Sequence, residues 1–280
     1  MEYMQPDTDR IRYVETDLSF LEGSPLHFVC GIYLVCVRGV CEVSTGAETF
    51  RLCDETELIF LSGTLLQRLS ASPDFKARML LIPKDVFLKA MLPIDTPYLN
   101  YADSHPCYTH TPDVRSRMTW KQVCVWMDAA RMLFSGTYRT QYPELLEFDY
   151  LQGFLIWLFG TIPEKIGREP HLTRQQHICR QFLQLIREYG QKEHSAAFYA
   201  GKLCISPRYL HRASTSCLGG KSPKQLIEGQ LLAEAKVLLN DMSLTVTEIA
   251  ELLHFPDQSY LTRFFKRHTG MSPRQYRQKR

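Results

Sequence analysis

Four polar side chains near the end of the chain recur at helical spacing and have the chemistry to contact a polyanion. The set is Ser259, Thr262, Arg263 and Lys266. Arginine can donate two hydrogen bonds to guanine, and serine or threonine can bond to several bases. Lysine neutralises phosphate. A short helix with this outward face has the composition of an element that lies against nucleic acid.

An apolar stripe on the opposite face must pack this helix on a core. It consists of Leu261, Phe264, Phe265 and His268, at i, i+3, i+4 and i+7. Asp257 is placed to cap the start of the helix, and Gly270 is placed to end it. An ordinary amphipathic surface helix has the same composition, so one stripe alone does not decide between the two interpretations.

The chain contains this element twice, at about 196–215 and about 246–268. Tyr209 matches Tyr260 and Arg212 matches Arg263, at an offset of 51 residues. The outward positions 208, 211, 212 and 215 therefore fall on 259, 262, 263 and 266. The closing motifs KSPKQ (221–225) and MSPRQ (271–275) match at an offset of 50. An incidental surface helix would not repeat its outward polar positions.

A short helix, a tight turn and a second helix with a basic, hydroxyl-rich face predict a helix-turn-helix, whose second helix enters the major groove. A long helix from Pro223 to about Asp241 joins the two units and should span about 28 Å. That length suits two recognition helices in successive major grooves, about 34 Å apart. One chain would then read about two turns of duplex DNA.

The capping and outward positions of both units are the predicted DNA contacts. In the first unit they are Ser206, Arg208, Tyr209, His211, Arg212 and Thr215. In the second unit they are Asp257, Gln258, Ser259, Thr262, Arg263 and Lys266. Phosphate contacts are predicted at Lys221, Lys224, Arg267 and Arg274.

Charge divides the chain into two halves. Residues 171–280 carry 17 Lys and Arg against 8 Asp and Glu, whereas residues 1–170 carry 16 against 22. A polyanion partner is thus expected for the C-terminal half only. The nine cysteines form no CxxC motif and lie mostly in apolar sequence, which is typical of a reducing cytoplasm. No signal peptide is visible, and the apolar run 151–162 is too short to span a membrane.

The N-terminal half begins with strand-like runs separated by turn residues. Six strands are predicted at 27–39, 40–45, 48–53, 56–63, 65–71 and 75–83. They favour a small antiparallel β-barrel or jelly roll, filled with side chains or holding one small ligand. Helices are predicted near 86–91, 115–134 and 143–159. The last two need each other, the barrel or a second subunit, and pairing across a dimer is the preferred interpretation.

The C-terminal region resembles the DNA-binding domain of the AraC/XylS family of bacterial transcription regulators. The resemblance lies in Ile249-Ala250, in FPDQSYLTRFFK (255–266) and in GMSPRQYR (270–277). The first unit departs from it, since Ala213-Ser214-Thr215 stands where the second has Phe264-Phe265-Lys266. This predicts a weaker hydrophobic anchor there, and a second unit that holds DNA more firmly.

The resemblance implies an α+β protein of two domains, with a cupin-like sensor barrel and flanking helices before an all-α domain. The expected divisions are a barrel at 1–114, a helical dimerisation segment at 115–161, a linker at 162–171 and a DNA-binding domain at 172–280. Expected partners are operator DNA, a small effector in the barrel, a second copy of the chain and, as a further candidate, RNA polymerase. The expected compartment is the cytoplasm, without membrane contact.

Two other classes of protein share some of these features. A metal-dependent cupin enzyme fused to a DNA-binding domain needs several histidines and a carboxylate inside the barrel, but the strands supply only His27. His105, Cys107 and His110 lie close together, in a connector that contains proline. The other class is a constitutive architectural DNA-binding protein without effector. We predict no catalytic residue, no metal and no cofactor.

Overall fold

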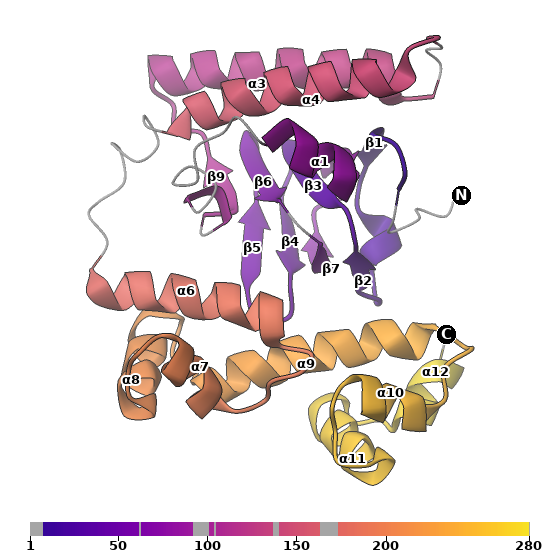
Figure 1. The fold of residues 1–280 in the computed structure, drawn as a ribbon, viewed down its shortest axis with the longest axis vertical. Helices are drawn as coiled ribbons and strands as arrows, with labels where there is room; N and C mark the ends of the chain where they lie inside the picture. The colour runs from indigo at the N-terminus through magenta and orange to yellow at the C-terminus, as the bar shows by residue number, and fades with distance from the viewer. Residues whose placement is uncertain are drawn as a thin grey trace.

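The computed structural model describes residues 8–61, 63–91, 101–103, 105–136, 140–162 and 173–279. Strands dominate the N-terminal part, two long helices lie over them, and the C-terminal part is helical (Figure 1). The chain is therefore an α+β protein with antiparallel sheets followed by a helical domain, as the sequence predicts.

Two antiparallel sheets form the N-terminal region. Their strands are β1 (Arg12–Thr16), β2 (Leu26–Phe28), β3 (Gly31–Arg38), β4 (Cys41–Ser44), β5 (Thr49–Leu52), β6 (Thr56–Phe60), β7 (Thr64–Ala71), β8 (Lys76–Ile82) and β9 (Cys107–Thr109). One sheet has the order β1-β8-β3-β6-β9 and the other β2-β7-β4-β5. A short 3-10 helix, η1 (Ser19–Leu21), precedes β2.

The strand prediction was wrong at three places. The run 27–39 is divided between β2 and β3, which belong to different sheets. Strand β1 was not predicted, and β9 lies in the segment interpreted as a connector. Both unpredicted strands are at the edges of the five-stranded sheet.

The space between the sheets is filled with side chains. Along β3, alternate residues Ile32, Leu34 and Cys36 are fully buried in one cluster with Phe28 and Leu52 from the other sheet. Of the two interiors considered from the sequence, a packed core and a ligand cavity, the packed core describes this cluster.

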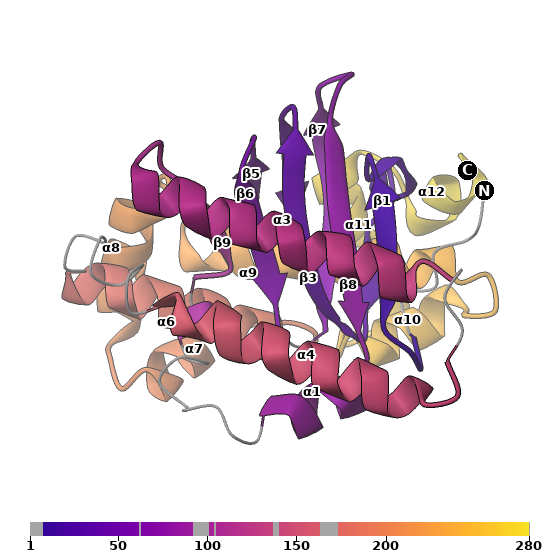
Figure 2. The same ribbon diagram turned by 90° about the horizontal axis from the view of Figure 1, so that it is seen from above.

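The opposite face of the five-stranded sheet is covered by helices. These are α1 (Lys84–Met91), α3 (Val114–Phe134) and α4 (Pro143–Gly160), and the two long helices cross the strands side by side (Figure 2). Tyr33 and Val35 of β3 share a buried cluster with Val123 of α3 and Phe154 of α4. Much of the apolar surface of the helices is thus covered by each other and by the sheet. Ile162, where the predicted linker begins, is buried in this cluster, and 163–171 lies outside the described residues.

Each C-terminal helix begins directly after a Ser, Thr or Asp residue whose side chain caps it. These helices are α6 (Arg174–Tyr189), α7 (Ala196–Lys202), α8 (Pro207–Cys217), α9 (Pro223–Asn240), α10 (Val246–Leu252), α11 (Gln258–Thr269) and α12 (Pro273–Gln278). Capping boxes begin α9 at Ser222 with Gln225 and α12 at Ser272 with Gln275. The match of the two closing motifs is therefore a match of helix starts.

Helix α9 belongs to both C-terminal cores. Leu226 and Ile227 pack with α6, α7 and α8, whereas Leu231, Ala235 and Leu239 pack with α10 and α11. The two small bundles consequently share one rigid element. In the part of the chain that the structure describes, no helix has the length and apolar character to cross a membrane.

Candidate nucleic-acid interface

The two turns between the paired helices have the same backbone. Cys204 and His254 both have φ of 54°, a left-handed conformation that is uncommon for residues other than glycine. The amide of Ile205 donates to Ala200 O at 3.0 Å, and that of Phe255 donates to Ala250 O at 2.8 Å. The sequence repeat is therefore also a repeat of local structure.

The recognition helices α8 and α11 are capped in the same way. The Ser206 hydroxyl accepts a hydrogen bond from the amide of Tyr209 at 3.2 Å, and the Asp257 carboxylate accepts one from the amide of Tyr260 at 2.7 Å. The extra residue Pro256 precedes the second cap, which explains the change of offset from 50 to 51. Ser206 and Asp257 thus cap the helix starts, as the sequence predicts.

The predicted outward face of α11 is exposed. Ser259, Arg263 and Lys266 are exposed and Thr262 is half-buried. Gln258 is half-buried, and its Oε1 accepts a hydrogen bond from Thr247 Oγ1 at 2.9 Å. That contact ties the first helix of the unit to the start of the second and leaves the Gln258 amide group as a donor.

The corresponding face of α8 is arranged similarly. Arg208, His211 and Arg212 are exposed, and Tyr209 and Thr215 are half-buried. The Thr215 hydroxyl donates to the carbonyl of His211 at 2.9 Å, so it is engaged with its own helix. The exposed basic residues are consequently the strongest candidates for base contacts in this unit.

Each unit places an arginine beside a tyrosine one turn earlier. The Arg212 guanidinium lies 4.9 Å from the centroid of the Tyr209 ring, and that of Arg263 lies 5.8 Å from the centroid of Tyr260. Tyr260 was not among the predicted contacts, although it is 48% exposed. The repeat could have identified it, because Tyr260 is the counterpart of Tyr209.

Two of the four predicted phosphate contacts share a carboxylate. Arg267 Nη2 lies 2.7 Å from Glu228 Oε1, and Lys224 Nζ lies 4.0 Å from the same oxygen. His268 Nε2 lies 3.5 Å from Glu228 Oε2, and its pKa is lowered, chiefly by burial. Lys221 and Arg274 are exposed.

The cores beneath the two recognition helices are built differently. In α11, Leu261, Phe264 and Phe265 are buried. In α8 the smaller Ala213 and Ser214 are also fully buried. Here the volume is supplied by Phe182 of α6 and Tyr199 of α7, whose rings pack edge to face at 5.4 Å. The prediction of a weaker hydrophobic anchor in the first unit considered α8 alone and did not include these two rings.

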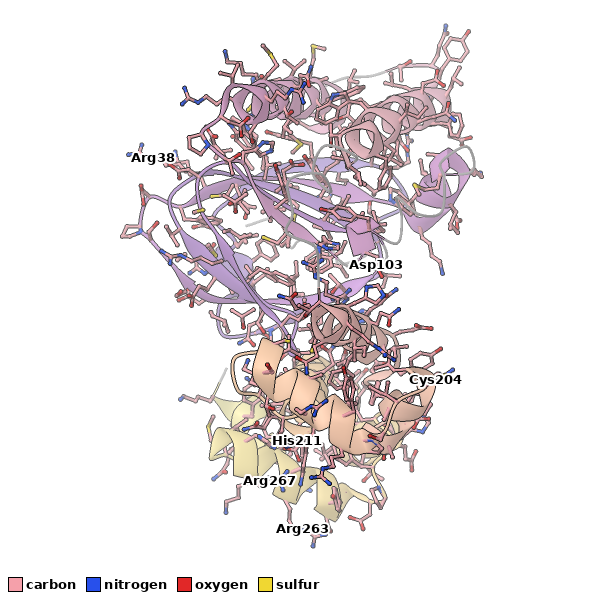
Figure 3. The ribbon with its side chains drawn as sticks, turned by 90° about the vertical axis from the view of Figure 1, so that its left-hand side faces the viewer. Arg38, Asp103, Cys204, His211, Arg263 and Arg267 are labelled. Carbon is pink, nitrogen blue, oxygen red and sulfur yellow. The ribbon has the colours of Figure 1, made fainter. Side chains whose placement is uncertain are left out.

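Both recognition helices lie on the side of the C-terminal domain away from the sheets. Figure 1 shows α8 on the far side of α6 and α11 on the far side of α9, and Figure 3 shows Arg263 directed away from the N-terminal domain. The predicted contact surface is therefore accessible to a large ligand such as duplex DNA.

One histidine of the N-terminal region, His110, takes part in a buried hydrogen-bond network. His110 Nε2 lies 2.7 Å from Glu57 Oε1, and His110 Nδ1 lies 3.1 Å from Ser116 Oγ. The Tyr33 hydroxyl donates to Glu57 Oε2 at 2.6 Å, and burial raises the pKa of Tyr33 well above its usual range. Among the described residues, no group of three or more His, Cys, Asp or Glu could hold a metal ion.

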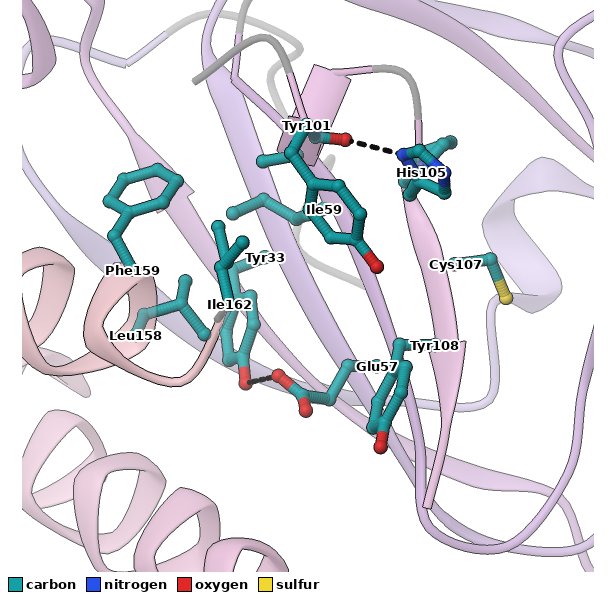
Figure 4. A pocket seen from close by; sticks show the side chains of 12 residues that line it. Tyr33, Glu57, Ile59, Tyr101, His105, Cys107, Tyr108, Leu158, Phe159 and Ile162 are labelled. Carbon is teal, nitrogen blue, oxygen red and sulfur yellow. Dashed lines mark hydrogen bonds between the residues drawn. The ribbon is translucent and has the colours of Figure 1, made fainter. Parts of the chain in front are cut away.

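A pocket opens above this network, between the five-stranded sheet and the helical layer (Figure 4). Its walls include Tyr33, Ile59, Tyr101 and Phe159, and Glu57 lies at its polar end. The ring of His105 stacks on Tyr101 at 4.0 Å. This pocket lies between the five-stranded sheet and the helices. The sequence predicts the effector on the other face of that sheet, inside the barrel.

Comparison with known proteins assigns the C-terminal region. A family described as a helix-turn-helix domain matches residues 199–279, which include both recognition helices. The arabinose operon regulatory protein of Salmonella typhimurium is 28% identical over 148 residues, covering 52% of this chain and 50% of that protein. An uncharacterized HTH-type transcriptional regulator of Bacillus subtilis, YobQ, is 45% identical over 58 residues, covering 21% and 24%.

Among solved structures, apo ToxT from Vibrio cholerae aligns over 98% of both chains, with 13% identity and a TM-score of 0.44. The chain spans about half the length of the arabinose operon regulators that it matches. The helix-turn-helix domain matched across both units and the similarity to arabinose operon regulatory proteins support an AraC/XylS-type assignment of the C-terminal region.

Proposed function

We propose that the chain regulates transcription by reading a specific operator through both recognition helices. The observation that carries this proposal is the repeated set of exposed polar positions on α8 and α11, mounted on equivalent turns and caps. Helix α9 has 18 residues and spans about 27 Å. This length is compatible with contacts in two successive major grooves.

Phosphate attraction would come from the basic C-terminal half. Lys221 is exposed just before the start of α9, and Arg274 is exposed in the first turn of α12, where it is the counterpart of Lys224 in the repeat. Basic side chains here would contact the backbone and fix the register, while Arg212 and Arg263 would read base edges.

Selection from a randomised duplex pool, followed by footprinting, tests this function. We expect one protected site of about 17–20 base pairs, with protection on one face of the duplex. Arg263→Ala should weaken the selected site by about 1–3 kcal/mol and relax specificity at one position. Arg274→Ala should weaken all sequences similarly and reduce the salt slope by about 1. Uniform coverage without a preferred site would favour an architectural protein instead.

We further propose that a small effector binds in the pocket between the sheet and α4. Its walls are aromatic and aliphatic, and its one buried carboxylate, Glu57, faces the interior (Figure 4). A compact, largely apolar molecule with a hydrogen-bond donor suits such a site. Glu57 also joins β6 to α3 through His110 and Ser116, so an occupant would contact a network that links sheet and helices.

A thermal-shift screen of small phenols and aromatic amines tests the effector site. A true occupant should raise the Tm of the wild-type chain and lose that effect in Ile59→Trp, whose side chain would fill the pocket. A matched Leu88→Trp control changes an exposed residue of α1. A compound that stabilises the Ile59→Trp chain as strongly as the wild type binds elsewhere.

The outer face of α3 supports a homodimer. Met118, Val125 and Met132 are 55%, 67% and 66% exposed and recur every seven residues, as in a coiled-coil seam. Lys121 and Asp128 flank this seam and would face each other across an antiparallel pair of α3 helices. We therefore propose that the partner of this seam is α3 of a second copy of the chain.

Sedimentation of the whole chain tests the dimer. Val125→Asp should shift the population to monomer, because it places a charge at the centre of the seam. Leu88→Asp, at an exposed apolar position of α1, should leave the oligomeric state unchanged. If both variants sediment like the wild type, α3 is not the interface.

A further inference from the structure

The turn between β4 and β5 lies against the middle of α9. A Cβ on Gly46 would lie 2.8 Å from Gln230 Cα, and a Cβ on Gly229 would lie 2.6 Å from Gly46 O. Real Cβ atoms do not approach other atoms so closely, so this contact requires glycine on both sides. Ala47, next in the turn, is 3% exposed and belongs to the core cluster of the first helix-turn-helix unit.

An ion pair next to the turn joins the N-terminal region to α6. The Arg187 guanidinium pairs with Glu48, and their side chains are 13% and 16% exposed. Arg187 Nη2 also donates to the carbonyl of Asp103 at 2.8 Å. Asp103 follows Tyr101 and Ala102, which line the pocket, so Arg187 contacts the segment that forms a pocket wall.

A third contact reaches the second helix-turn-helix unit. Asn240, the last residue of α9, donates through Nδ2 to the Ser24 hydroxyl, and the Tyr276 hydroxyl of α12 donates to Gly23 O at 3.3 Å. The N-terminal domain therefore touches helices of both units, with the shared helix α9 between them.

Docking leaves the proposed DNA surface uncovered. The residues of α8 and α11 predicted to contact DNA take no part in these three contacts. As seen from the sheets, α8 lies behind α6 and α11 lies behind α9 (Figures 1 and 3). If the N-terminal domain inhibited DNA binding by covering the recognition helices, it would have to bury these residues, and it does not.

We infer that the N-terminal domain holds the two helix-turn-helix units in a fixed relative position by contacting the side opposite to α8 and α11. The chain with these contacts should therefore bind DNA more tightly than a chain without them. Contacts along α9, α6 and α12 restrict the relative motion of the units before DNA arrives. When the two units are already fixed relative to each other, DNA binding does not have to offset the entropy lost in ordering them. The inference rests on the DNA binding proposed above and adds the N-terminal domain as a positive contributor to it.

Gly229→Ala tests the contribution of these interdomain contacts to DNA binding. Alanine favours a helix interior over glycine, so the C-terminal domain should keep its fold. The added methyl group would nevertheless meet Gly46 O and displace the turn. The matched control is Gly201→Ala in α7, where a Cβ would meet nothing within 4 Å.

Two measurements on the full chains give the result. Small-angle scattering should show a larger radius of gyration for Gly229→Ala than for the wild type and Gly201→Ala. The Kd for the duplex that the wild-type chain selects should rise about fivefold in Gly229→Ala, the low end of common coupling effects, and stay unchanged in Gly201→Ala.

Three results would overturn the inference: an expanded Gly229→Ala chain with unchanged affinity, one with higher affinity, or a chain that stays compact. Failure of the wild-type chain to select any duplex would instead reject the proposed function.

Discussion

The guanidinium carbon of Arg263 lies 5.8 Å from the centroid of the Tyr260 ring, and the equivalent Arg212 lies 4.9 Å from Tyr209. A cation beside an aromatic face is attracted to it, so the ring restricts the positions of the guanidinium. In both units the arginine therefore has a neighbour that can orient it before it meets a base.

Tyr260→Leu should reduce sequence discrimination more than general affinity. Loss of a cation–π contact at an exposed site is expected to cost about 0.5–1 kcal/mol, or roughly two- to fivefold in Kd for the selected duplex. Tyr260→Phe keeps the ring and should behave like the wild type. Binding to the selected and to a scrambled duplex measures the effect, and equal losses on both would show that Tyr260 does not act through base recognition.

Glu228→Gln should strengthen binding to all DNA sequences. The carboxylate holds Arg267 at 2.7 Å, and its removal frees that cation for phosphate. The salt slope should become steeper by about 1. Because Arg267 is 58% exposed, the loss in folding stability should stay within about 1 kcal/mol.

The matched variant Arg267→Gln should show the opposite effect on affinity if Arg267 contacts phosphate. Unchanged affinity in both variants would show that the ion pair between Glu228 and Arg267 has no role in DNA binding.

Phe264→Ala and Phe182→Ala should destabilise different units. Each removes a buried ring, at an expected cost of about 3–5 kcal/mol. Hydrogen exchange should locate the first effect in α10 to α12 and the second in α6 to α8, because the rings belong to separate clusters. Equal loss of protection over both units would show that they unfold together through α9.

Thiol alkylation should follow burial. Burial raises the pKa of Cys36 and of Cys107 to about 12, so their reactive thiolate form should be nearly absent from pH 8 to pH 10. Cys204 is exposed at the turn before α8 and should react first with iodoacetamide. Mass spectrometry of digested protein measures the order. Rapid labelling of Cys107 below pH 10 in the folded chain would contradict its raised pKa.

The helix-turn-helix pair could be predicted because its signals are local. The cap Asp257, the stripe Leu261, Phe264 and Phe265, and the end at Gly270 lie within 14 residues. The second copy then separated a functional face from an ordinary amphipathic one. Cys204 and His254 give no such local signal for their left-handed backbone, which becomes evident only as a shared geometry.

The N-terminal half was harder to predict because its elements depend on distant partners. Strand β1, RYVET, is short and carries two charged residues among its five, as edge strands often do, and it pairs with residues 77–81. The pocket combines Tyr33, Glu57, Tyr101 and Phe159, which no periodicity connects. Which face of β3 meets the other sheet also depends on register, and alternation alone leaves it open.

Because Phe182 of α6 fills the core beneath α8, the two units of the repeat differ in how much of the chain each needs to complete its core. A fragment from 221 to 279 would carry α9 to α12 with the phenylalanines of its own recognition helix. The first half would need α6 as well, since Ala213 and Ser214 leave a volume that only a neighbouring helix fills. When the units are transplanted into another protein, residues 221–279 should therefore suffice for the second unit. The first unit should fold only if the transplanted segment begins at residue 173.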